Sequence, residues 1–376
     1  MRLGMSSLVV SVPKEWAEKY ALSKDSRLVL IPQPDGSLAL YPETISRESP
    51  RQITLTVKSG DIEGLLEQRM VAAYLTDFDE IRIQSTEVMT PELSQRIRQA
   101  LRFLTGYQIM EADAVQLLIQ NVARVADMDV MKALHRIHSI SHSMLKDAIV
   151  ALSKRDAALA KTVMSLEEDV VQFYYLVNKQ LRSNLLDPQA MQQSGLTAID
   201  SINYSLFLHA VQRIAMAAKI IAKAAITLNE KECPEEILDV VRDSGEIVLS
   251  LFDKASTAFL TRNDIAACEV MARSEDYTPL QETVDNILDQ HLSKVYSEIG
   301  GTSSAKSRER LDDFHAALRV VEQVFHSLHL VACAASRISE VAVWRAMEVH
   351  RPPAKPRRKR RKRSKSEETD GGPSAS

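Results

Sequence analysis

SKRDAALAKTVMSLEED (residues 153–169) and TRNDIAACEVMARSEDY (residues 261–277) are two similar stretches, and they decide the fold of the larger part of this 376-residue chain. The second stretch lies 108 residues after the first. A second similar pair, KIIAKAA (219–225) and HLVACAA (329–335), is 110 residues apart. Because the two offsets nearly agree, the sequence predicts that a whole unit of the chain is duplicated.

Long helical patterns surround both copies and leave no room for strands. In the alignment of the two copies, Asp156 matches Asp264. Short breaks separate the helical runs, which predicts antiparallel packing. We therefore expect two three-helix bundles, at residues 128–230 and 234–348. The expected helices span residues 128–153, 157–183, 196–228, 234–261, 264–297 and 303–348.

Residues 50–123 have a different pattern, in which strands and helices alternate. QITLTV (52–57) and EIRIQS (80–85) alternate in the way strands do. The stretch between them is typical of a helix that begins at Asp61, and a second helix is expected to begin after Thr90 as its N-cap. The remaining residues are typical of a hairpin. The sequence predicts a small α/β domain with the order βαβαββ.

Residues 1–48 are the smallest unit that the sequence predicts. SLVVSVPKEWAEKY (7–20) combines a short β-run with a helix that starts near Pro13. RLVLIPQPDGSLALYP (27–42) contains two strand-like runs joined by an Asp-Gly turn. A segment this short buries too little apolar surface to be stable by itself. A second copy would supply that surface, so we expect a homodimer through residues 1–45.

The bulk composition predicts a cytoplasmic protein without a membrane-inserted segment. Hydrophobic residues make up 45% of the chain and aromatic residues only 5%, which suits a helical protein. No apolar run approaches the roughly 20 residues needed to span a bilayer, and the first residues lack a signal-peptide pattern. The three cysteines are far apart without CxxC spacing, which fits a reducing compartment.

Charge is distributed unevenly along the chain. The net charge is −3, but residues 351–376 contain ten Lys or Arg and three Asp or Glu, which leaves −10 for the rest. We expect residues 349–376 to form a disordered basic tail. The tail has no aromatic residue, so binding to DNA, RNA, polyphosphate or an acidic surface would be blind to sequence; a solvated tail without a partner is the alternative. The candidate DNA- or anion-binding cations are Arg2, Lys14, Lys19, Arg357, Arg358, Lys359, Arg360, Arg361, Lys362 and Arg363.

Several stretches carry a resemblance to known families. Residues 6–42 resemble the AbrB/SpoVT/MazE swapped-hairpin domain, in which two chains interleave into one small barrel. Residues 62–121 are similar to the linker domain of archaeal PhoU-like proteins. HRIHSISHSMLKDAIVALSKRDAALAK (135–161) and QRIAMAAKIIAKAA (212–225) resemble the first and third PhoU helices. In this order they resemble an archaeal-type phosphate uptake regulator of the PhoU family with an AbrB-like N-terminal domain.

The resemblance implies a multidomain, mainly α fold. Its expected parts are a swapped-hairpin β-barrel at residues 1–48, a small α/β domain at residues 50–123, PhoU-like tandem three-helix bundles, and the basic tail.

The resemblance also implies a carboxylate-rich metal cluster, with Glu-x-x-x-Asp on the second helix of each repeat and Glu-Arg-x-x-Asp on the third. A spacing of four places both carboxylates on one helix face. This chain departs from both motifs, because neutral residues stand where the second carboxylate is expected. The departing pairs are Glu167 with Val171, Gln212 with Met216, and Glu275 with Pro279.

Two stripes of histidine remain as candidate metal ligands. Glu322, His326 and His329 are the metal site that the sequence favours, on a helical stripe that also contains His315 and Cys333. Such a stripe could hold zinc or iron, although the sequence establishes no cofactor. The alternative is that these are hydrogen-bonded polar groups on a half-buried face. The same two interpretations apply to the stripe of His135, His138 and His142.

No catalytic motif is present, such as a glycine-rich phosphate loop, GxSxG or HExxH, so the chain is not expected to be an enzyme. The favoured function is a cytoplasmic, dimeric regulator of phosphate uptake and homeostasis. It would contact a phosphate-transporter ATPase, a sensor protein or DNA, and DNA binding would make it a transcriptional regulator. The alternatives are an AbrB-type transcriptional regulator that senses another ligand or a metal, and a non-catalytic metal-binding helical protein.

Overall fold

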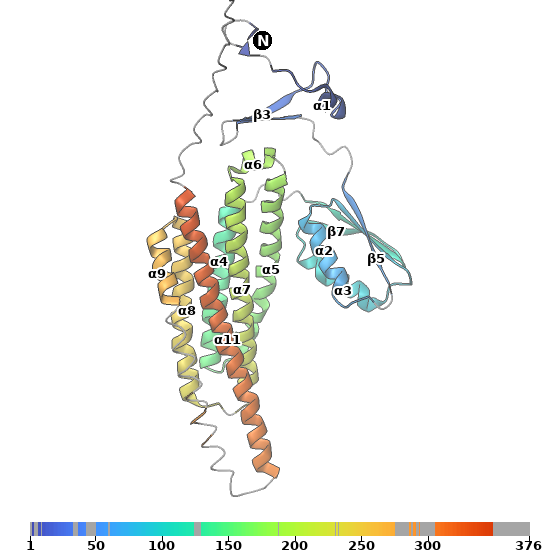
Figure 1. Ribbon diagram of the computed structural model, residues 1–376. Helices are drawn as coiled ribbons and strands as arrows, with labels where there is room; N and C mark the ends of the chain where they lie inside the picture. Colours follow the sequence, from blue (N-terminus) through green and yellow to red (C-terminus); the bar gives the residue numbers. More distant parts are fainter. Residues whose placement is uncertain are drawn as a thin grey trace, which may run out of the picture. The chain divides into compact units, whose positions relative to one another are not determined.

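The computed structural model describes residues 2–3, 7–8, 10–32, 37–42, 50–58, 61–123, 129–186, 188–229, 231, 233–274, 286, 289–290, 293 and 305–348. The chain divides into two units, one containing residues 1–48 and the other residues 49–350. The protein is mainly helical with small sheets, as the sequence predicts (Figure 1).

The N-terminal unit contains two separate two-stranded sheets. β1 (Arg2–Leu3) pairs with β2 (Ser7–Leu8), and β3 (Leu28–Pro32) pairs with β4 (Leu38–Pro42), both antiparallel. The helix α1 (Lys14–Lys19) follows Pro13, which occupies its N-cap position. Among the described residues neither sheet closes into a barrel. Because a swapped barrel requires two chains, it stays a prediction, and the expected Asp-Gly turn lies outside the described residues.

The α/β region has the predicted order of elements, and its helices cover one face of a mixed sheet. The strand order is β5-β6-β8-β7; β5 and β6 are parallel, and the other pairs are antiparallel. Buried apolar side chains such as Met70 and Ile83 form the core between sheet and helices. The elements are β5 (Gln52–Val57), α2 (Leu65–Leu75), β6 (Glu80–Ser85), α3 (Pro91–Arg102), β7 (Tyr107–Ala112) and β8 (Gln116–Asn121).

The two helix starts in this region differ in how well the sequence predicted them. Thr90 caps α3 as expected, because its hydroxyl accepts a hydrogen bond from the Leu93 amide. The expected start of the preceding helix at Asp61 is wrong. The Asp61 carboxylate instead accepts from the Lys58 amide, and α2 begins after Gly64, which adopts a left-handed conformation with φ of 80°.

Helices form most of the described residues from 129 to 348, and most of the long helices begin and end within three residues of the predicted positions. They pack around one continuous hydrophobic core. Both predicted bundles contribute to this core: residues 128–230, called the first helix set below, and residues 234–348, the second helix set. Figure 1 shows α7 and α11 running side by side along its centre. The helices are α4 (Val130–Ser153), α5 (Ala157–Leu186), α6 (Pro188–Ser194), α7 (Ala198–Leu228), α8 (Glu235–Thr261), α9 (Asp264–Ser274) and α11 (Ala305–Glu348).

The duplication is visible in the turns between helices, but the register differs by one residue from the sequence alignment. Arg155 after α4 and Arg262 after α8 both have left-handed backbones, with φ of 54° and 56°. Asp156 caps α5 by accepting from the amides of Ala158 and Leu159, and Asn263 caps α9 by accepting from the amide of Ala266. The match of Asp156 with Asp264 is therefore wrong, because the capping role belongs to Asn263.

The two helix sets also meet through α4 and α8. Gly245 of α8 lies so close to α4 that an added Cβ would stand 2.8 Å from side-chain carbons of Ile149. A glycine at this point allows the two backbones to approach, which explains why a residue of poor helix propensity occurs within a long helix.

Candidate functional site

Glu167, the one carboxylate of the expected metal motif between residues 128 and 230, forms an ion pair. The Glu167 carboxylate on α5 lies 2.9 Å from the Nζ atom of Lys219 on α7. Gln212 donates a hydrogen bond to the Sδ atom of Met216 within α7. A lysine ammonium therefore neutralises the remaining carboxylate of the motif, so this position needs no metal to balance its charge. In the second set, Glu275 and Pro279 lie outside the described residues.

Most of the α11 stripe is exposed, although His315 is half-buried. Glu322, His326 and His329 all have exposed side chains, and the thiol of Cys333 lies 3.4 Å from Nε2 of His329. In the described part of the chain, no three His, Cys, Asp or Glu side chains gather as metal ligands would. The metal-binding role of Glu322, His326 and His329 stays a prediction, and so does the zinc or iron it would hold.

The α4 stripe lies partly against α8. The ring of His138 packs edge-on to Phe252 of α8, with 4.9 Å between ring centroids. Burial, together with the neighbouring charges of His142 and His135, lowers the pKa of His138 to about 4, although Asp253 acts in the opposite direction. Its Nε2 atom is buried and has no hydrogen-bond partner in the described residues. The interpretation as a packed polar seam fits His138 better than a ligand role.

A buried arginine near the end of α11 joins α7, α8 and α11. Arg345 of α11 is only 3% exposed. Its guanidinium donates to the Phe259 carbonyl of α8 and to the Tyr204 hydroxyl of α7, both at 2.7 Å. It also lies over both rings, 4.8 Å and 4.7 Å from their centroids. Burial lowers the pKa of Arg345, and the nearby charge of Arg262 lowers it further.

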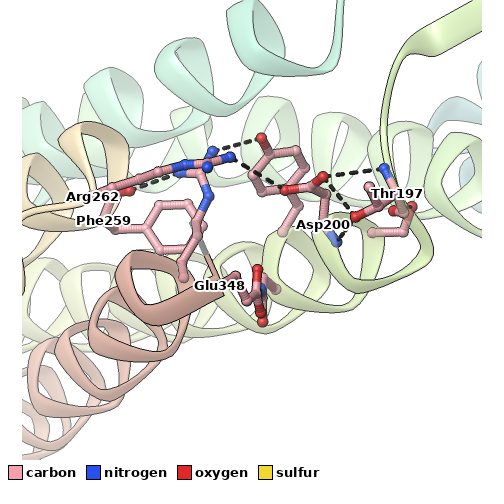
Figure 2. Close-up of polar contacts among 9 residues, drawn as sticks. Thr197, Asp200, Phe259, Arg262 and Glu348 are labelled. Carbon is pink, nitrogen blue, oxygen red and sulfur yellow. Dashed lines mark hydrogen bonds and ion pairs between the residues drawn. The ribbon is translucent and has the colours of Figure 1, made fainter. Parts of the chain in front are cut away.

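Polar contacts continue from this arginine to the start of α7. Arg262 pairs with Asp200 at 3.6 Å, and Asp200 forms a capping box with Thr197. Glu348 at the end of α11 accepts a hydrogen bond from Asn203. Figure 2 shows these groups between the ends of three helices. The cluster fixes the relative positions of α7, α8 and α11, which is a structural role.

A buried lysine connects the helical region to the α/β region. The Nζ atom of Lys179 on α5 lies 4.5 Å and 4.6 Å from the ring centroids of Tyr74 and Tyr107. It also lies 3.4 Å from a carboxylate oxygen of Asp77 and 3.4 Å from the Tyr107 hydroxyl. A cation between two aromatic rings and a carboxylate is well compensated for its burial.

Replacing Lys179 with methionine is expected to destabilise the α/β region by about 2 kcal/mol, because it removes the ammonium group that contacts Asp77 and lies over the rings of Tyr74 and Tyr107. Native-state hydrogen exchange would show faster exchange in β7 and α2, with the core of α7 unchanged. Arg182→Met, which removes one exposed side-chain contact to the Leu75 carbonyl, is the matched control. Equal exchange in both variants would contradict the role of Lys179.

Two of the predicted nucleic-acid cations of the N-terminal unit lie on α1, and each contacts a nearby side chain. Lys14 lies 3.5 Å from Glu18, and Lys19 lies over the ring of its neighbour Tyr20. Arg2 lies in β1. The seven tail residues Arg357, Arg358, Lys359, Arg360, Arg361, Lys362 and Arg363 lie outside the described residues.

One described helix, α7, is long and apolar enough to cross a membrane by length and composition. More than half of its apolar stretch is buried inside the protein, which is the behaviour of a core helix.

The sequence analysis missed Arg345 and Lys179. A signal for Arg345 was present, since it is a lone cation within the apolar run VAVWRAM at the end of the last helix. A signal for Lys179 was weaker, because it occurs among ordinary polar residues of a long helix.

Comparisons with known proteins identify one part of the chain. Residues 134–225 match the family model of the PhoU domain. The crystal structure of PhoU from Pseudomonas aeruginosa is 19% identical and covers 59% of this chain and 96% of its own, with a TM-score of 0.48. The crystal structure of the phosphate transport system regulatory protein PhoU from Streptococcus pneumoniae is 14% identical and covers 57% and 92%, with a TM-score of 0.44. No curated protein shows a significant match. The PhoU match therefore covers the first helix set, from α4 to nearly the end of α7.

Proposed function

We propose that this protein is a non-catalytic cytoplasmic regulator of phosphate uptake, built as an archaeal-type PhoU protein. The observation that supports the proposal is the PhoU-domain match over residues 134–225, which coincides with three long helices and their shared core. The similar left-handed turns at Arg155 and Arg262 support the proposal that residues 234–348 repeat the same architecture.

The partner that we propose is the ATPase subunit of a phosphate transporter. The full-length chain would be immobilised and exposed to the phosphate-transporter ATPase encoded in the same genome. We expect saturable binding to this subunit, with no binding to the ATPase of an unrelated transporter as control. Absence of binding, or equal binding to both subunits, would count against the proposal.

We also propose that the N-terminal unit forms a homodimer. The pairing of β3 with β4 places Leu30 opposite Leu40 and Pro32 opposite Leu38, so these leucines share one face of the hairpin. Leu30 is 58% exposed and Leu38 is 66% exposed in the single chain. An apolar face of this kind on so small a unit requires a cover, and a second copy supplies it.

The full chain is expected to sediment as a dimer, and the double variant Leu30→Asp, Leu38→Asp as a monomer, because two carboxylates would be buried at the interface. Lys24→Asp, a charge change at an exposed turn of the same unit, should remain dimeric. A monomeric wild type, or a dimer that survives both leucine substitutions, would refute this arrangement.

A further inference from the structure

A hollow in the α/β region lies beside the carboxyl end of β5 and is lined by residues of α2 and α3. The cavity has a volume of about 300 Å³, and it joins a second hollow of about 500 Å³ that shares Thr56, Lys58, Asp61 and Arg69. Lys58, Asp61 and Ile62, which follow β5, and Thr90, which caps α3, contribute to its lining.

The walls of the cavity are apolar on one side and cationic on the other. Val57, Leu65, Leu66 and Leu93 form the apolar side, and Ile62 at its edge is 78% exposed. The volume is within the range of pockets that bind small molecules. A ligand with an apolar or sugar body therefore has a surface to contact.

Three cations line the hollow, and the side chains of two of them form no hydrogen bond or ion pair with any described residue. Arg96 is committed to Glu67, to which it donates through Nε and Nη2 at 2.6 Å and 3.0 Å. Burial opposes ionisation of Glu67, but the hydrogen bond from Arg96 helps to lower its pKa. The side chains of Lys58 and Arg69 make no hydrogen bond or ion pair with any described residue.

The acidic group of the cavity is already engaged. The Asp61 carboxylate accepts from the Lys58 amide at 2.9 Å, which holds it against the backbone of the loop. In addition, α2 has no side-chain cap at its N-terminus. Lys58 and Arg69 thus leave positive charge available beside an uncapped helix start, which favours an anion.

We propose that this cavity binds a small molecule with a phosphate monoester group on an apolar or sugar body. Lys58 and Arg69 hold the phosphate, and the side of the cavity formed by Val57, Leu65 and Leu93 contacts the body. The proposal rests on the cavity alone and does not depend on the proposed role in phosphate uptake. If the cavity proposal and the proposed function both hold, the concentration of a phosphorylated metabolite could regulate the activity of this protein in phosphate uptake.

The test uses AMP as the probe, with isothermal titration calorimetry on the full-length chain. AMP is expected to bind, while adenosine and inorganic phosphate bind at least about tenfold more weakly, since each supplies half of the contacts. Arg69→Ala and Lys58→Ala should each weaken AMP binding about tenfold, because each removes a charge-assisted hydrogen bond. Arg98→Ala, an exposed cation of α3 outside the cavity, is the matched control.

Both cavity cations are exposed, so their substitution leaves the core intact, and thermal melting would verify this. No binding of AMP, or binding that survives both substitutions, would overturn the proposal. If adenosine bound as tightly as AMP, the phosphate group would contribute nothing to binding. If inorganic phosphate bound as tightly as AMP, the apolar or sugar body would contribute nothing. Either result would also overturn it. A protein that does not bind AMP but does bind the transporter ATPase would overturn the cavity proposal alone and leave the proposed function standing.

Discussion

Arg345→Ala is expected to destabilise the protein by about 4 kcal/mol, the largest effect of any single substitution considered. The change leaves the Phe259 carbonyl and the Tyr204 hydroxyl buried without the donor that serves both. Each unpaired buried group costs about 1–3 kcal/mol, and the lost contact with two aromatic rings adds to this.

The measurement is the free energy of unfolding in urea at pH 7. Arg337→Ala is the matched control on the same helix: Arg337 pairs with Glu340 and lies over Trp344, but its side chain is 48% exposed. The control should change stability by less than about 1 kcal/mol. A loss of similar size in both variants would show that Arg345 does not join the helix sets.

Acidification is expected to cost about 3 kcal/mol of stability through His138 alone. Its pKa is about 4 in the folded protein, against an ordinary value of 6.5. The unfolded chain therefore binds a proton between these values while the folded protein does not, so stability falls as pH decreases from 6.5 to 4. Above pH 6.5 both states are neutral and the contribution of His138 is constant.

The groups around His138 define the control for this prediction. His142 and His135 on α4 disfavour its charged form, and Asp253 on α8 favours it. His138→Gln should flatten the dependence of stability on pH between 6.5 and 4, and His135→Gln, at an exposed position, should retain it. Urea unfolding at intervals of pH would show this. An unchanged slope in His138→Gln would mean that another group causes the loss.

The sequence predicted the elements of the fold because their signals are local. Periodic apolar residues indicated the long helices, and Thr90 before Pro91 indicated the N-cap of α3. The predicted helix start at Asp61 was wrong because a short aspartate side chain can accept a hydrogen bond from a neighbouring amide in a turn as well as cap a helix. The one-residue error at Asp264 has a similar origin, since Asn263 and Asp264 are both capping residues and only the backbone hydrogen bonds distinguish them.

The contacts that join the parts of the protein were beyond sequence analysis. Lys179 lies 72 residues from Tyr107, and Arg345 lies 86 residues from Phe259. No local pattern indicates which aromatic ring or carbonyl a buried cation will meet after folding. The cavity beside Arg69 was missed for the same reason, because its lining comes from a strand, two loops and two helices.

Phosphate uptake in cells is the measurement that tests the central claim most directly. Cells that lack this gene would be compared with wild-type cells and with cells carrying a restored copy, under phosphate-rich and phosphate-poor conditions. The proposed function predicts that the ratio of uptake rates between the two conditions changes on deletion and returns with the restored gene. An identical ratio in all three strains would contradict a role in phosphate regulation.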